Sequence, residues 1–146
     1  MFHVLIPIDD DDERANKQID SLLSLPGDAD DLSVELLHVI EEIETAADEA
    51  GATFVEDLNE SLPEVRGPPK SVDEAERRLE EAGIETRRRE MVGDPADGIL
   101  RVARETDADA IVLGARKRSP VGKAVFGSVT QSVILETDRM VIVAND

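Results

Sequence analysis

Cysteine, tryptophan and tyrosine are absent from this sequence, and phenylalanine occurs only three times. The lack of cysteine excludes disulfides, thiol catalysis and zinc sites built on thiolates. The lack of tryptophan and tyrosine removes the aromatic platforms on which single-stranded nucleic acids stack. The hydrophobic core must therefore be built from aliphatic side chains.

Long hydrophobic runs are also missing. No apolar segment approaches the roughly 18–20 residues that a membrane-spanning helix needs. The amino-terminal sequence MFHVLIPIDD passes from apolar to acidic residues without the basic region of a signal peptide. With 146 residues, the chain is long enough for one domain with one core. We expect a single cytoplasmic domain spanning residues 1–146.

Positive charge is scarce, because 34 acidic residues face only 16 lysines and arginines, for a net charge of -18. Such a charge repels nucleic acids and anionic membranes, so neither is expected as a general partner. One interpretation is an acidic surface for a basic partner. The other is a halophilic surface adapted to high salt, where screening weakens self-repulsion. The spread of the acids along most of the chain and the rarity of lysine favour the halophilic interpretation.

Short apolar runs alternate with amphipathic segments along the chain. Such alternation predicts an α/β fold with a five-stranded parallel, doubly wound sheet and helices on both faces. Ligands of these folds bind beyond the carboxyl ends of the strands. The expected strands are Val4–Ile8, Leu32–Ile40, Ile84–Val92, Ala110–Gly114 and Met140–Ala144.

Helix boundaries carry clear signals. Acidic residues 10–13 crowd one helix start, where negative charge is favoured, and Pro26-Gly27 follows its end. Ser71–Glu74 has the pattern of a capping box, and Asp94-Pro95 that of an N-cap with proline at the next position. A last helix is expected from Ser128 to about Thr137. The expected buried positions are Ala15, Ile19, Leu22 and Leu23, then Val72, Ala75, Leu79 and Ala82, then Ala96, Ile99, Leu100 and Ala103.

The segment around residues 41–70 is acidic and ends in Gly-Pro-Pro. We interpret it as a variable insertion, part helix and part irregular chain. Either it is simply a solvated acidic excursion, or it is a surface for a partner.

One stretch departs from the acidic background, because no Asp or Glu occurs from Ala110 to Leu135. Arg116, Lys117, Arg118 and Lys123 lie within it. Gly114 ends a predicted strand, and Gly127-Ser128 opens a predicted helix, whose N–H groups attract anions. Together with the hydroxyls of Ser128 and Thr130, these features indicate a phosphate site. The alternative is an exposed loop in which Ser128 is an ordinary N-cap.

Two familiar phosphate motifs do not fit this stretch. A dinucleotide-binding Gly-x-Gly-x-x-Gly is absent after the first strand, where the sequence reads PIDDDDER. A Walker A loop is excluded because Ala124 follows Gly122-Lys123 and Lys117 stands where the first glycine belongs.

The elements nonetheless resemble a known family. Pro7-Ile8-Asp9 after the first strand, LLHVI in the second and the late glycine loop resemble the universal stress protein family, over nearly the whole chain. Nucleotide-binding members carry a glycine, two residues, a second glycine, nine residues and then Gly-Ser or Gly-Thr. Gly114 matches the first glycine and Gly127-Ser128 the end of this motif. The resemblance implies a Rossmann-like sheet of strand order 3-2-1-4-5.

The resemblance also implies a site for ATP, or for AMP or ADP, possibly with magnesium. Asp9, with the backbone of Pro7 and Ile8, would contact adenine and ribose, and Val39 would line the adenine pocket. Gly114 would let the ligand lie against the strand end. The phosphates would be received by Gly127, Ser128, Val129 and Thr130, with Arg116 and Lys117 as further candidate binding residues.

Lys117 departs from the motif, because it stands where the family has its second glycine. If that position needs a positive φ, lysine costs on the order of 1 kcal/mol there. Its side chain either fills the phosphate space or binds a phosphate as a point charge. The clustered cations favour the second interpretation.

Catalytic arrangements are not apparent. His3 and His38 lie in predicted strands, so we interpret both as packed residues and not as bases or ligands. The carboxylate runs 9–12 and 41–44 are interpreted as solvated helix ends, although Asp9 is a candidate for helping to hold a magnesium ion that accompanies a nucleotide. No dedicated enzyme is predicted, and at most slow ATP hydrolysis.

The resemblance places Met140–Ala144 at an edge of the sheet and implies a homodimer through it. An apolar edge strand favours pairing with a second chain. The resemblance thus implies a homodimeric stress-response protein that senses an adenine nucleotide. The alternative is a dimeric scaffold of the same fold without a ligand.

Overall fold

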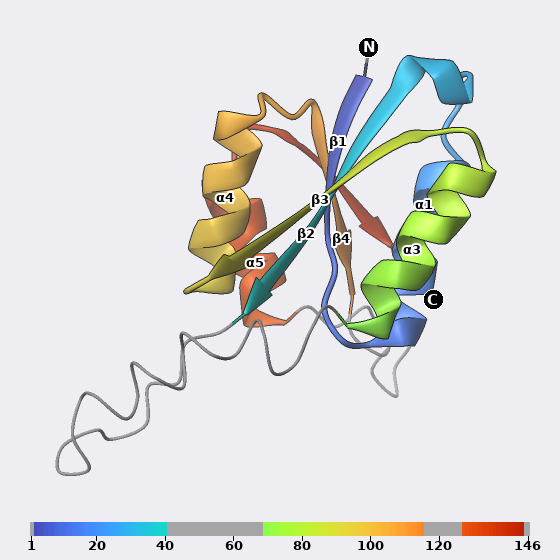
Figure 1. The fold of residues 1–146 in the computed structure, drawn as a ribbon. Helices are drawn as coiled ribbons and strands as arrows, with labels where there is room; N and C mark the ends of the chain where they lie inside the picture. Colours follow the sequence, from blue (N-terminus) through green and yellow to red (C-terminus); the bar gives the residue numbers. More distant parts are fainter. Residues whose placement is uncertain (1, 41–68, 116–126, 145–146) are drawn as a thin grey trace, which may run out of the picture.

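A computed structural model describes residues 2–40, 69–115 and 127–144 of the chain (Figure 1). Its strands are β1 (Phe2–Pro7), β2 (Leu32–Ile40), β3 (Glu85–Val92), β4 (Ala110–Gly114) and β5 (Met140–Ala144). Its helices are α1 (Asp12–Leu23), α3 (Lys70–Glu81), α4 (Pro95–Glu105) and α5 (Ser128–Glu136), with a short 3-10 turn, η1 (Ala29–Asp31), before β2.

All five strands form one sheet in the order β3-β2-β1-β4-β5, and every pair is parallel. This confirms the predicted fold and strand order. The helices α1 and α3 cover one face of the sheet, and α4 and α5 cover the other (Figure 1). The crossovers put β3 and β5 at the edges, as expected from the polar sequence of β3.

The core is split by the sheet into two aliphatic clusters. In β1, Val4 and Ile6 face the α1–α3 cluster while Leu5 faces the α4–α5 cluster. Because successive strand residues point to opposite faces, a strand covered on both sides appears in the sequence as a continuous apolar run. That is why β1 and β4 were recognisable from their composition.

Of the helices α1, α3 and α4, two begin with a local signal, which is an aspartate side chain that caps the helix. Asp11 caps α1 by accepting a bond from the Arg14 N–H (2.9 Å), and Asp94 caps α4 by accepting from the Asp97 N–H (3.0 Å). The capping box predicted at Ser71–Glu74 is wrong. The cap of α3 is Pro69, which has no side chain able to accept a bond, and Ser71 lies inside the first turn.

Two predicted core positions are also wrong. Leu23 is 42% exposed at the end of α1, and Ala82 is exposed at the end of α3. Both lie where a helix leaves the sheet, so helical periodicity overstates the length of the buried stripe. Gly83, with φ +79°, ends α3 as expected for a glycine after a helix.

The expected acidic insertion falls almost wholly on residues 41–68, which lie outside the described residues, as do Arg116, Lys117, Arg118 and Lys123. Only its last two positions are described, where Pro69 caps α3 and Lys70 begins it. Within the described part of the chain, no helix is long and apolar enough to span a membrane.

Candidate functional site

A pocket of about 250 Å³ opens at the carboxyl end of the sheet, between β1 and β4. The pairing of these two strands covers only Val4 with Ala110 and Leu5 with Ile111. Beyond it, β1 leads to α1 on one face and β4 leads toward α5 on the other (Figure 1). This is the switch point at which open parallel sheets form ligand sites.

Nine of the eleven sequence-predicted site residues line this one pocket, and the other two, Arg116 and Lys117, lie outside the described residues. The nine come from four places in the sequence that the fold brings together. They are Pro7, Ile8, Asp9, Val39, Gly114, Gly127, Ser128, Val129 and Thr130.

The Asp9 carboxylate points into the pocket with its two oxygens already engaged. Oδ1 accepts a hydrogen bond from the Asp11 N–H at 3.0 Å. Oδ2 accepts from Nη1 of Arg14, with which it forms an ion pair. The side chain of Asp9 is 47% exposed, so its remaining lone pairs are open to a ligand.

Gln18 connects the two strands where their pairing stops. Its buried amide nitrogen donates to the carbonyl oxygen of Pro7 at 2.7 Å and to that of Val112 at 3.0 Å. Gln18 thus supplies a donor to a carbonyl of each strand where the pairing of β1 with β4 has stopped. Sequence analysis missed Gln18, although a polar residue beside Ala15 and Ile19 on a buried helix face was a usable signal.

The turn after β1 is held from two further elements. Nδ1 of His38, in β2, lies 3.0 Å from the Ile8 carbonyl oxygen. The hydroxyl of Ser71, in α3, donates to the Asp9 carbonyl oxygen and is 2% exposed. Ser71 thus serves the site and not the start of its own helix, which explains why the capping-box interpretation failed.

The apolar half of the pocket lies between β2 and α4. Val39, Pro95 and Ile99 line this part of the pocket. A Cβ at Gly98 would lie 3.2 Å from Cγ2 of Val39, so the glycine lets α4 approach β2 closely. Pro95 and Ile99, which were predicted only as helix residues, are therefore pocket residues as well.

Gly114 has a neighbour that the sequence did not reveal. A Cβ at this position would overlap Cγ and Cδ of Arg14. The space that glycine leaves is therefore filled by the aliphatic part of Arg14, which also places the guanidinium in the pocket beside Asp9. The resemblance had implied only that a ligand would use this space.

The amino terminus of α5 forms a further wall of the pocket. Gly127 is the N-cap, with no side-chain capping bond, and Ser128 is the first helical residue. The interpretation of Ser128 as an ordinary N-cap is therefore wrong. No acidic residue occurs in the first turn, and the Thr130 hydroxyl donates to the Gly114 carbonyl at 3.3 Å. Free N–H groups at this helix end suit an anion.

Among the described residues, no group of three or more His, Asp or Glu side chains is arranged to hold a metal ion. His3 lies in β1, away from the pocket lining, and His38 is engaged with a carbonyl. The pocket offers hydrogen-bond donors, one acceptor carboxylate and an apolar wall, which is the composition of a binding site.

Comparison with known proteins identifies the family. The sequence matches the profile of the Universal stress protein family over residues 1–145. The chain belongs to the universal stress protein family. This agrees with the resemblance found in the sequence motifs.

The relatives of this universal stress protein include archaeal and bacterial members. MJ0577 of Methanocaldococcus jannaschii is 27% identical over 121 residues, which cover 75% of each protein. Its solved structure aligns with a TM-score of 0.74 at 25% identity, over 99% of this chain and 96% of that chain.

Two further members extend the comparison. A universal stress protein of Mycolicibacterium smegmatis is 36% identical over 72 residues, which cover 49% of this chain and only 55% of that protein. A universal stress protein of Archaeoglobus fulgidus, solved in complex with dAMP, shares the fold with a TM-score of 0.62 at 22% identity, over 98% of this chain and 97% of that chain.

Proposed function

We propose that this universal stress protein binds an adenine nucleotide, ATP in the first place, in the pocket between β1 and β4 and acts as a nucleotide-dependent sensor or switch. The observation that carries the proposal is the convergence of Asp9, Val39, Gly114 and the first turn of α5 around one cavity. The dAMP complex of the Archaeoglobus fulgidus protein supports the ligand class.

The chemistry of the pocket fits the parts of a nucleotide. Val39, Pro95 and Ile99 offer an apolar surface to the base, and the Asp9 carboxylate can accept hydrogen bonds from the ribose. The amino terminus of α5 offers N–H donors to the phosphates. A magnesium ion would enter with the phosphates, because it keeps most of its waters and needs only one or two protein carboxylates.

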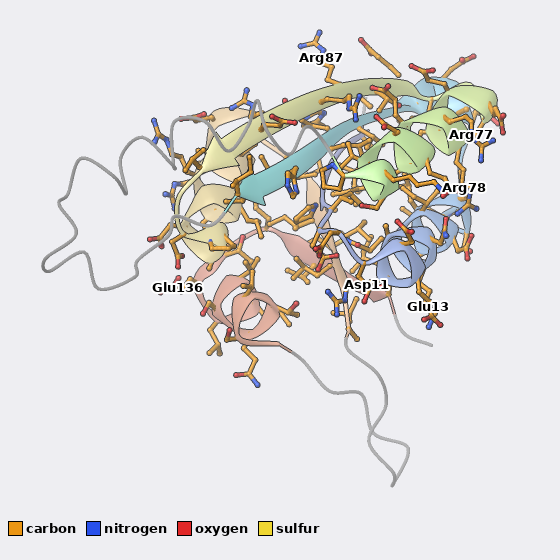
Figure 2. The ribbon with its side chains drawn as sticks, turned by 60° about the horizontal axis from the view of Figure 1, so that its bottom comes forward. Asp11, Glu13, Arg77, Arg78, Arg87 and Glu136 are labelled. Carbon is orange, nitrogen blue, oxygen red and sulfur yellow. The ribbon has the colours of Figure 1, made fainter. Side chains whose placement is uncertain are left out.

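The test is calorimetric titration of the protein with ATP, AMP, adenosine and GTP, with mass spectrometry of small molecules released on denaturation. We expect adenine nucleotides to bind and to be lost in Asp9→Ala and Gly127→Val. Glu136→Ala is the matched control, since this carboxylate is exposed at the other end of α5 (Figure 2). Absence of binding to wild-type protein at millimolar Mg-ATP would leave a ligand-free scaffold as the function.

We also propose that the protein works as a homodimer joined through β5. The strand is an edge, and exposed apolar side chains lie on it and on the helix that precedes it in the sequence. Met140 is 58% exposed and Leu135, near the end of α5, is 83% exposed. Monomers that hide this surface from water gain the hydrophobic free energy of both side chains.

The dimer is tested by sedimentation equilibrium in molar KCl. The pair of substitutions Leu135→Lys and Met140→Lys is expected to give monomers, because charge at the centre of an interface must be desolvated. Leu23→Lys is the control on α1, where Leu23 is 42% exposed. A wild-type protein that is monomeric at all concentrations contradicts the proposal.

The acidic surface is proposed to be an adaptation to high salt within the cytoplasm. Of the described acidic residues, only Glu35 is buried, so nearly all of the negative charge meets solvent. Screening at molar KCl reduces the mutual repulsion of these carboxylates. The free energy of unfolding should therefore rise with KCl concentration, and full stability in dilute buffer would favour an acidic surface made for a basic partner.

A further inference from the structure

Arg14 is a cation inside the pocket that the family motif does not account for. It lies in the first turn of α1, and its side chain is 27% exposed. Nη1 pairs with Asp9, and Nη2 lies 3.6 Å from Oδ2 of Asp11. Its aliphatic part packs where a side chain on Gly114 would be. The arginine is therefore held by two carboxylates and by packing, and its guanidinium remains partly open to the pocket.

Arg14 is the one positive charge among the described residues that line the pocket. Among its described lining residues, Asp9 and Arg14 are the only charged ones. Asp9 is followed at the start of α1 by four acidic residues, which are Asp10, Asp11, Asp12 and Glu13. Figure 2 shows Asp11 and Glu13 there. Without Arg14, no described lining residue would compensate the Asp9 carboxylate that a phosphate meets next to an acidic helix end.

Two anion-attracting groups converge on Gly114. Arg14 packs against it from α1 on one face of the sheet, and Thr130, in the first turn of α5, donates to its carbonyl from the other. A phosphate bound in the pocket beside Gly114 would thus lie near a guanidinium and near a helix amino terminus. A guanidinium binds two phosphate oxygens at once, which lysine cannot do with the same geometry.

We propose that Arg14 is the residue that makes this pocket specific for phosphorylated ligands. In the free protein the guanidinium neutralises Asp9. When a nucleotide binds, the guanidinium contacts the ligand phosphate and releases Asp9 to accept hydrogen bonds from the sugar. The inference rests on the proposed nucleotide function and adds which ligands the pocket selects.

The test compares affinities for adenosine, AMP and ATP in wild-type protein and in two variants, in the same KCl buffer. Arg14→Met keeps the aliphatic packing on Gly114 and removes the charge. Loss of a charge-assisted bond should weaken AMP and ATP about ten- to hundredfold. Adenosine should change less than about threefold, because it brings no phosphate. Arg14→Lys keeps the positive charge but lacks the planar guanidinium that binds two oxygens at once. Its affinities for AMP and ATP should therefore lie between those of wild type and Arg14→Met.

Arg77→Ala is the matched control. Arg77 also lies on a helix and pairs with two carboxylates, Glu81 at 2.9 Å and Glu74 at 3.6 Å, but it is exposed on α3 away from the pocket (Figure 2). Arg77→Ala changes the net charge by the same amount as Arg14→Met and should leave the affinities for adenosine, AMP and ATP unchanged. Circular dichroism and denaturant unfolding verify that each variant is folded.

The outcomes separate this inference from the proposed function. If Arg14→Met weakens adenosine as much as AMP, Arg14 only positions Asp9, and the selectivity is refuted while nucleotide binding stands. If all three ligands bind more tightly to the variant, including the case in which only the variant binds them, Arg14 obstructs the pocket and the inference is overturned. If neither protein binds any ligand, both the inference and the proposed function fail.

Discussion

The side-chain amide of Gln18 donates a hydrogen bond to the carbonyl oxygen of Val112, 94 positions later in the sequence, at 3.0 Å. The bond joins α1 to the central strand β4 at the level where the pairing of β4 with β1 has ended. The same nitrogen also donates to the Pro7 carbonyl. The buried side chain of Gln18 thus keeps the pocket open between β1 and β4, and it donates a hydrogen bond to a carbonyl of each strand.

Replacement of Gln18 by leucine should destabilise the fold. Both carbonyls would lose the donor that Gln18 supplies, which costs about 1–3 kcal/mol for each group where it stays buried. For the two groups together, we expect the free energy of unfolding to fall by about 2–6 kcal/mol in urea titrations. Gln131→Leu, at an exposed position of α5, is the control and should change it by less than about 0.5 kcal/mol. A similarly small change for Gln18→Leu would show that the two carbonyls find other donors.

Replacement of Ser71 by alanine should act on the site from a different helix. The substitution leaves the Asp9 carbonyl without the hydroxyl that reaches it across 62 positions. We expect a loss of about 1 kcal/mol in unfolding free energy, measured against Ser132→Ala on α5. If Ser71 were instead the cap of α3, then Ser71→Asp would preserve stability, since aspartate caps as well as serine. We expect Ser71→Asp to be the more damaging change, because it places a carboxylate against a carbonyl.

Substitution of Arg89 alone should lower the free energy of unfolding more than substitution of Arg89 together with its ion-pair partner Glu35. Glu35 lies in β2 with a side chain only 7% exposed, and its Oε1 lies 3.3 Å from Nε of Arg89, which is 37% exposed on the edge strand β3. Arg89→Ala leaves a buried charge uncompensated and should cost about 2–3 kcal/mol of unfolding free energy. The double variant Glu35→Leu, Arg89→Leu should recover most of this loss.

Arg87→Ala is the control for the Arg89 substitution, since Arg87 is 75% exposed on the same strand and points away from the sheet (Figure 2). A double-mutant cycle then gives the coupling of Glu35 and Arg89. A double variant as unstable as Arg89→Ala alone would mean that packing and not charge holds β3 in place.

Glu105 should contribute a pH-dependent part of the stability. The hydrogen bond from Arg101, helped by one from Arg89, holds the pKa of the Glu105 carboxyl below its usual range against the opposing effect of desolvation. A carboxyl with a lowered pKa in the folded state stabilises the fold above its unfolded pKa, near 4.3. That contribution is lost as the pH falls from there through the folded pKa.

Glu105→Gln is therefore expected to be less stable than wild type at neutral pH, and the difference should shrink and vanish on acidification. Unfolding curves collected from pH 7 downward measure this difference. Glu80→Gln, on the exposed surface of α3, serves as the reference for loss of one negative charge. A difference between wild type and Glu105→Gln that stays constant with pH would rule out this ionisation as its source.

Much of the architecture could be predicted because its signals are local. Asp11 and Asp94 cap helices within three residues of their own positions. The bounds of β2, β4 and β5 coincide with the predicted apolar runs, since these strands are recognised by composition alone. The glycine motif located the pocket because a strand end and a helix start, each set by nearby residues, come together whenever the sheet is parallel.

The sequence by itself thus determined the alternation of strands and helices and the end of the sheet where ligands belong, because these follow from short-range patterns. The family and the order of the strands followed from the resemblance of its motifs to a known family. Only the tertiary structure decided the roles of Arg14, Gln18 and Ser71. Each of them acts on an atom 62 or more positions away or fills space left by a distant glycine. No local pattern encodes such contacts, because they exist only once the helices have packed on the sheet.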